Sequence, residues 1–129
     1  FPTRRSSDLG GLSSAETLRL VGQKMIEEAT QPIPLGLMRL YITEAPRHGT
    51  LIREVDYIGR EAAVAMISAA LEPTLNYEAD HHARLIAEKF IDIAFIPYLM
   101  RRLLGDTESS LNLRVDEAIL CLKALGLLN

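Results

Sequence analysis

The chain has 129 residues, no tryptophan and a single cysteine, Cys121. One cysteine excludes a disulfide within the chain and fits a reducing compartment, so we expect a cytoplasmic protein. Cys121 falls in an apolar stretch with no histidine nearby in sequence, which favours a buried filler over a functional thiol. Hydrophobic residues make up 48% of the sequence, enough to bury a sizeable core in one domain.

The sequence also lacks a long apolar run and an excess of basic residues. A membrane-spanning helix needs about 18 uncharged residues, and the closest stretch, Phe90 to Met100, is shorter and contains Asp92. No secretory signal is visible. The net charge is −3, and a mildly acidic domain is poorly suited to holding nucleic acid by itself.

The first nine residues, FPTRRSSDL, are unlike the rest of the chain. Reverse-translated as TTC-CCT-ACA-CGA-CGC-TCT-TCC-GAT-CTN, they match a common sequencing-adapter oligonucleotide in one frame. We therefore expect Phe1 to Leu9 to be a cloning or assembly artefact and residues 10–129 to be the native domain. The chain has no starting methionine, and we expect an N-terminal part to be missing.

Helical periodicity dominates the remaining sequence, and period-two alternation is missing. Gly and Pro fall between helical blocks, which predicts five helices: Ser13 or Ser14 to Ala29, Pro34 to Ala45, Leu51 to Leu71, Asp80 to Gly105, and Ser110 to Leu128. A turn is expected at His48-Gly49-Thr50, and Pro97 should kink the fourth helix. The third helix is expected to turn inwards Ile52, Val55, Ile58, Ala62, Ala63, Met66 and Ala70.

The last two helices are more apolar than one small monomer can bury. The final helix has one stripe at alternating steps of four and three, Leu111, Val115, Ala118, Leu122 and Leu125, and a second apolar set, Leu113, Ile119, Leu120, Cys121 and Leu127. The chain's own bundle can cover one side, so the other side predicts a subunit interface. We assign that interface to the first stripe together with Pro97 and Met100. The alternative is that both sets are core, because periodicity alone cannot separate core from interface.

The stretch Leu37 to Gly49, LMRLYITEAPRHG, carries a family resemblance. It resembles the C-terminal domains of TetR-family transcriptional regulators, in which an apolar helix ends in a Glu-Ala-Pro-Arg-like turn. The order that follows is also similar, with an amphipathic helix, a polar loop, a helix containing AEKF (Ala87 to Phe90), LLG (Leu103 to Gly105) and a final helix. The likeness covers roughly Ser13 to Leu128.

This resemblance implies a homodimer whose final two helices from each subunit form a four-helix bundle. It also implies a small apolar or amphipathic effector, held in the C-terminal domain, whose binding releases operator DNA from an N-terminal helix-turn-helix domain. That domain is absent from this sequence, so the chain by itself should not bind DNA specifically.

A ligand pocket in a helical domain opens between helices and is lined by apolar and aromatic groups. Tyrosine hydroxyls could orient a polar group of the ligand, and methionines adapt to its shape. The alternative for each residue is plain core. The candidates are Met25, Leu37, Met38, Tyr41, Tyr57, Met66, Phe90 and Phe95.

Metal binding and catalysis have little support. Glu78 and His81 have the Glu-x-x-His spacing of di-iron bundles, with His82 beside them, but such sites need two of these motifs. Asp80 is better explained as a helix cap. Asp92 could face solvent, pair across an interface or line the pocket, and we favour solvent or an interface pair. No residue set resembles a catalytic centre.

We therefore expect no enzyme activity, no metal and no cofactor. Two other interpretations remain open. The chain could be a structural helical bundle that dimerises without a ligand, or a ferritin-like metal bundle, which the missing ligands disfavour.

Overall fold

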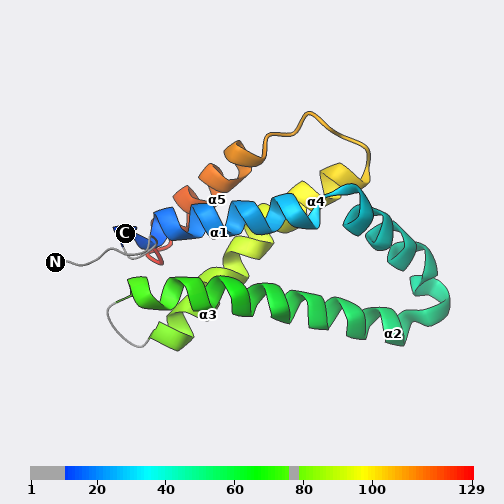
Figure 1. Ribbon diagram of the computed structural model, residues 1–129, viewed down its shortest axis with the longest axis horizontal. Coiled ribbons are helices and arrows are strands. Elements are labelled where there is room, and N and C mark those ends of the chain that lie inside the picture. Colours follow the sequence, from blue (N-terminus) through cyan, green and yellow to red (C-terminus); the bar gives the residue numbers. More distant parts are fainter. Residues whose placement is uncertain (1–10, 76–78) are drawn as a thin grey trace.

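The computed structural model describes residues 11–75 and 79–129, except for the side chains of 79–81, and all regular elements in this part are helical (Figure 1). The elements are α1 (Ser14–Ala29), α2 (Pro32–Leu71), the 3-10 turn η2 (Glu72–Thr74), α3 (Ala79–Phe90), the π-helical turn η3 (Ile91–Phe95), α4 (Ile96–Leu103) and α5 (Leu111–Ala124). The expected all-helical fold is confirmed. Phe1 to Leu9 lie outside the described residues.

Helix α1 begins where its capping residues predict. The Ser13 side chain accepts a hydrogen bond from the Glu16 backbone N–H at 3.1 Å, and the Ser13 N–H donates to the Glu16 carboxylate at 2.9 Å. This capping box satisfies two of the donors that a helix start leaves free. The hydrogen bond from the Ser13 N–H to the carboxylate lowers the pKa of Glu16, and the Ser13 side chain lowers it further. Pro32, which cannot continue α1, instead starts α2.

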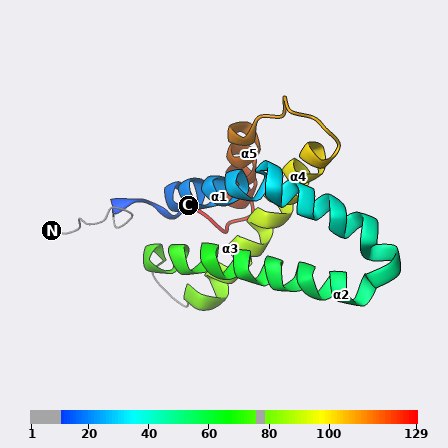
Figure 2. The same cartoon turned by 45° about the vertical axis from the view of Figure 1, so that its right-hand side comes forward.

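Helix α2 contains the second and third expected helices in one bent element. His48 departs from helical geometry with φ −128° and ψ 40°, two residues after Pro46. We call residues 32–47 the first arm of α2 and residues 49–71 the second arm. Figures 1 and 2 show the first arm leaving the end of α1 and the second arm running back beneath α1 after the turn. The turn lies where it was expected. α3, η3 and α4 run on without a break, as expected for the fourth helix. The described chain therefore has four continuous helices where five were expected, because the second and third are joined in α2.

The continuous helix formed by α3, η3 and α4 is called the long helix below. It accommodates Pro97 through a wider turn just before the proline. Pro97 has no N–H and therefore cannot donate to the Ile93 carbonyl four residues earlier. In η3 the Ile96 N–H donates to the Ile91 carbonyl, five residues back instead of four. Such a wide turn carries one extra residue relative to an α-helix. The expected kink at Pro97 thus takes the form of a π turn at Ile91–Phe95.

The core lies where α1, the second arm of α2, α3–η3 and α5 meet. Helix α1 packs on α2 and α5, α3 packs on α2, and α5 also contacts α3 and η3. The largest fully buried side chain is Phe90, whose ring lies against Gly22 of α1. A Cβ atom at Gly22 would stand 2.4 Å from Phe90 Cζ, so the absence of a side chain at Gly22 is what admits the ring.

Only the end of α2 takes part in this core. Val64, Ile67, Ser68 and Leu71 are buried, whereas no side chain from position 36 to 63 is. Of the seven residues expected to face inwards from the third helix, Ile58, Ala62 and Met66 are exposed. The expectation was wrong for Ile58 because α2 there extends past the elements that could cover it (Figure 2). Ala62 and Met66 lie at the covered end of α2 but on its exposed side.

Thr17 of α1 places a hydroxyl in the core. The residue has no exposed surface, and its Oγ1 is a buried oxygen without a hydrogen-bond partner among the described residues. A buried hydroxyl without a partner costs about 1–3 kcal/mol. We expect Thr17→Val, which keeps the shape and removes the hydroxyl, to raise the free energy of unfolding by about 1 kcal/mol, measured by urea denaturation. A lower stability than wild type would show that the hydroxyl is satisfied in solution.

Candidate functional site

The apolar stripe predicted as an interface on α5 is the face that the chain buries itself. Val115, Ala118 and Leu122 have no exposed surface and belong to the core cluster formed with α1, α2 and α3. The assignment of these three to a dimer interface is therefore wrong for this structure, since a partner cannot reach them. The remaining members behave differently: Leu111 and Pro97 are half-buried, and Met100 and Leu125 are exposed.

The opposite face of α5 is apolar and uncovered. Leu120 is 68% exposed, and Leu113 lies two turns before it on the same side. Leu125, which directly follows the helix and comes three residues after the buried Leu122, is also exposed, at 62%. Cys121, expected to be buried, is exposed beside them. Helix α4 and its end present a comparable stripe at four-residue spacing, Ile96, Met100 and Leu104, all exposed. These six residues are called the outer stripes below: Ile96, Met100, Leu104, Leu113, Leu120 and Leu125.

The residues predicted to line one ligand pocket are not brought together. Phe90 and Met25 are buried in the core, and Phe95, Met38 and Tyr41 are half-buried. Leu37, Tyr57 and Met66 are exposed. The Phe90 ring, a predicted lining residue, is packed against Gly22 and faces no pocket.

Two of the predicted residues do share a groove between α1 and the second arm of α2. Met25 and Met66 line it, and its volume is about 250 Å³. Four further lining residues were not predicted from the sequence: Leu20, Val21, Lys24 and Glu28. Leu20 carried a signal, because it is an apolar residue on the otherwise polar side of α1, next to Arg19 and four residues before Lys24.

The chemistry of this groove is that of a surface for an amphipathic molecule. Its apolar floor comes from leucine, valine and methionine side chains, and Lys24 and Glu28 stand at its edge as an ion pair at 3.5 Å. Both charged side chains are largely exposed, so each can be displaced at small cost in free energy. The groove can therefore take an apolar body with a charged or polar end.

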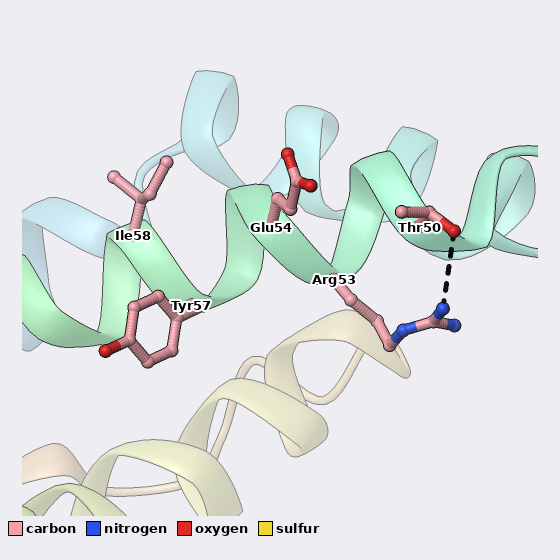
Figure 3. Close-up of a pocket in the computed structure, with 5 residues that line it drawn as sticks. All are labelled: Thr50, Arg53, Glu54, Tyr57 and Ile58. Carbon is pink, nitrogen blue, oxygen red and sulfur yellow. Dashed lines mark hydrogen bonds between the residues drawn. The ribbon is translucent and has the colours of Figure 1, made fainter.

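A second hollow, of about 430 Å³, lies on the second arm of α2 beside the bend (Figure 3). Its lining residues are Thr50, Arg53, Glu54, Tyr57 and Ile58. All five belong to one helix, and Tyr57 is 64% exposed. Arg53 donates to the Thr50 hydroxyl at 3.5 Å, while Glu54 and Ile58 point to the other side of the helix (Figure 3). A single helix cannot enclose a ligand, so this hollow is open surface.

Ion pairs join α2 to the long helix at its outer side. Asp92 of η3 is half-exposed and pairs with Arg60 of α2 at 3.0 Å, so its partner lies within the chain. Arg84 of α3 holds Glu61 of α2 through two hydrogen bonds of 2.8 and 3.0 Å. These hydrogen bonds lower the pKa of Glu61 and raise the pKa of Arg84, because each group stabilises the charged form of the other.

The loop between α4 and α5 is shaped by Asp106. Its carboxylate accepts a hydrogen bond from the Glu108 backbone N–H at 2.9 Å and pairs with Arg101 at 3.1 Å. Both contacts, the backbone one first, lower the pKa of Asp106. Ser110 then caps α5 by accepting from the Leu113 N–H at 3.2 Å. This local bonding fixes where α5 starts relative to α4.

Among the side chains that the structure describes, no group of three His, Cys, Asp or Glu residues is placed to hold a metal ion. Glu78 and the side chain of His81 lie outside the described residues, so the Glu-x-x-His spacing is not tested. His82 approaches the Leu127 carbonyl with Nε2 at 3.3 Å. None of the described helices combines the length and hydrophobicity needed to cross a bilayer.

Searches against protein-family models, curated proteins and solved structures found no match to this chain.

Proposed function

We propose that the chain is the effector-sensing and dimerisation domain of a TetR-like transcriptional regulator. In this proposal α4 and α5 join a second copy through their outer stripes, and a small apolar or amphipathic effector binds between α1 and α2. Operator binding belongs to a separate helix-turn-helix domain. The order of helices around the Glu44-Ala45-Pro46-Arg47 turn supports the family, and the protein is not proposed to be an enzyme.

The observation that carries the proposal is the uncovered apolar surface on the last two helices. Six large apolar side chains are exposed there, although α4 and α5 each bury their opposite face in the core. An exposed apolar stripe along a helix is a typical contact surface for another helix. A second copy would bury it by packing α4 and α5 of both subunits together, which is the four-helix arrangement that the resemblance implies.

The groove between α1 and α2 is the proposed effector site. It contains two of the eight residues predicted to line a pocket, Met25 and Met66, whereas Phe90 is fully buried in the core. Met25 and Met66 supply adaptable apolar contacts, and Lys24 and Glu28 supply charge at the edge. The proposed ligand therefore has an apolar body and one polar end.

The dimer is tested with Leu120→Glu, which puts a charge into the outer stripe of α5 without touching the core. We expect the dimer dissociation constant from sedimentation to rise about 100-fold, because the carboxylate would be buried without a partner. Ile33→Glu, an equally drastic change at an exposed apolar position on α2, is the matched control and should leave association unchanged. Equal dissociation constants for wild type and Leu120→Glu would contradict the interface.

Native mass spectrometry of the purified chain then separates the proposal from its alternatives. A dimer with an additional small-molecule mass, absent from a Met66→Glu variant, supports the effector site. A dimer that never carries such a mass favours a structural dimerisation module. A monomer at micromolar concentration would contradict the dimer.

A further inference from the structure

The long helix is attached to α2 on both sides of its π turn. On one side, Arg39 of the first arm donates through Nη2 to the Arg102 carbonyl, at the end of α4, over 3.3 Å. On the other side, Glu61 of the second arm pairs with Arg84 of α3, and Arg60 pairs with Asp92 within the π turn itself. The two arms of α2 therefore contact different ends of the long helix, the first arm at α4 and the second arm at α3.

The two arms meet at the bend at His48, where α2 makes few buried contacts with the rest of the chain. No side chain between positions 36 and 63 is buried, and the backbone leaves helical geometry at His48. Segments with few buried contacts and exposed hydrogen bonds open at low cost in free energy. The angle between the arms can therefore change while the core formed by α1, α3, α5 and the end of α2 stays closed.

The segment between the attachment points is the weakest part of the long helix. η3 uses hydrogen bonds to the fifth residue back, and Pro97 leaves the Ile93 carbonyl without its helical donor. Sharp changes of helix direction occur at such wide turns and prolines. If the angle between the arms of α2 changes, Arg39 moves with α4 and Glu61 moves with α3, so the change in direction falls on the π turn between them.

We propose that the π turn Ile91–Phe95 is a pivot that couples the bend of α2 at His48 to the direction of α4. The device links two surfaces that are far apart in sequence, the exposed arms of α2 and the outer stripe of α4. This coupling needs neither a ligand nor a second subunit. A test of the coupling is therefore independent of a test of the proposed function.

The test measures amide hydrogen exchange, by NMR or mass spectrometry, in three variants. Arg39→Gln removes the attachment of the first arm to α4. We expect the amides of Phe95 and Ile96 to exchange about fivefold faster in this variant, because α4 then lacks its attachment to α2 and moves more freely about the π turn. Arg101→Gln is the matched control, because it breaks an exposed ion pair to Asp106 at the same end of α4 without involving α2. It should leave these amides unchanged.

The reciprocal variant is Pro97→Ala, which restores a donor for the Ile93 carbonyl. Coupling free energies are symmetric, so a change at the π turn must appear at the bend. We expect exchange across residues 45–52 to change by about the same factor, with the melting temperature confirming that each variant is folded. The pivot is overturned if Arg39→Gln alters only the end of α4, if Pro97→Ala alters only its own turn, or if Arg101→Gln reproduces the effect of Arg39→Gln.

Discussion

Leu122→Arg is expected to unfold the chain, with a loss of about 4 kcal/mol or more in the free energy of unfolding. Leu122 has no exposed surface and lies in the core cluster with Val115 and Ala118. A guanidinium placed there would lose its hydration and find no carboxylate within the cluster. A loss of this size is a large part of the stability of a domain of this length. Far-UV circular dichroism and urea titration would measure it.

The matched control is Leu120→Arg, two residues away on the uncovered face of α5. Its side chain stays in solvent in the single subunit, so the monomer should keep its fold and helical content. The two variants separate core from interface on one helix. A folded Leu122→Arg protein that merely dissociates from a dimer would restore the original assignment of this stripe to the subunit contact and would contradict the packing of α5 described above.

Gly22→Ala is expected to cost about 3 kcal/mol, a large effect for the addition of one methyl group. The new Cβ would lie 2.4 Å from Phe90 Cζ and 2.5 Å from Cε2. Phe90 has no exposed surface, so its ring cannot move aside without displacing the surrounding core. The helix propensity of alanine, better than that of glycine by about 1 kcal/mol, opposes the clash without cancelling it. Thermal and urea denaturation would measure the difference.

A second substitution makes this prediction specific to the contact. Phe90→Leu alone should destabilise the chain by creating a cavity, but it leaves space for the methyl group that Gly22→Ala adds. In the double variant the two losses should therefore sum to less than their separate values, with a coupling energy of about 1 kcal/mol or more. Additive losses would show that Gly22 and Phe90 do not meet. Gly36→Ala, at an exposed helical glycine with open space around its Cβ, is the control and should be neutral or stabilising.

Local signals in the sequence predict the helix positions well. Ser13, Glu16 and Pro32 define α1, since a capping box and a proline act on their own neighbours. The final helix is shorter than predicted. It ends at Ala124 because Gly126, at φ 77°, lets the Leu127 N–H turn back to the Leu122 carbonyl. The leucines after Gly126 prolong the apolar pattern past the helix end and hide this stop.

The hydrophobic pattern of the sequence does not predict which element covers each helix face. Val115, Ala118 and Leu122 do form one stripe, but periodicity does not say whether a stripe meets its own chain or another. Met66 and Ile58 looked like core residues because their helix is amphipathic, but Ile58 lies on the uncovered middle of α2 and Met66 lines the groove against α1. The contact of Gly22 with Phe90 joins residues that are distant in sequence, and nothing local signals it. The candidate site was therefore only partly predictable, through Met25 and Met66.

The uncovered middle of α2 has a consequence for how this chain can change in evolution. No side chain between positions 36 and 63 is buried, so most substitutions at the exposed positions of this stretch should be tolerated by the fold. The stability of the single subunit therefore does not require apolar residues at Leu37, Tyr57 and Ile58, which are exposed. If natural variants retain apolar residues at these exposed positions of α2, the retention would indicate selection for binding a partner. Retention of the core residues would indicate selection for stability instead.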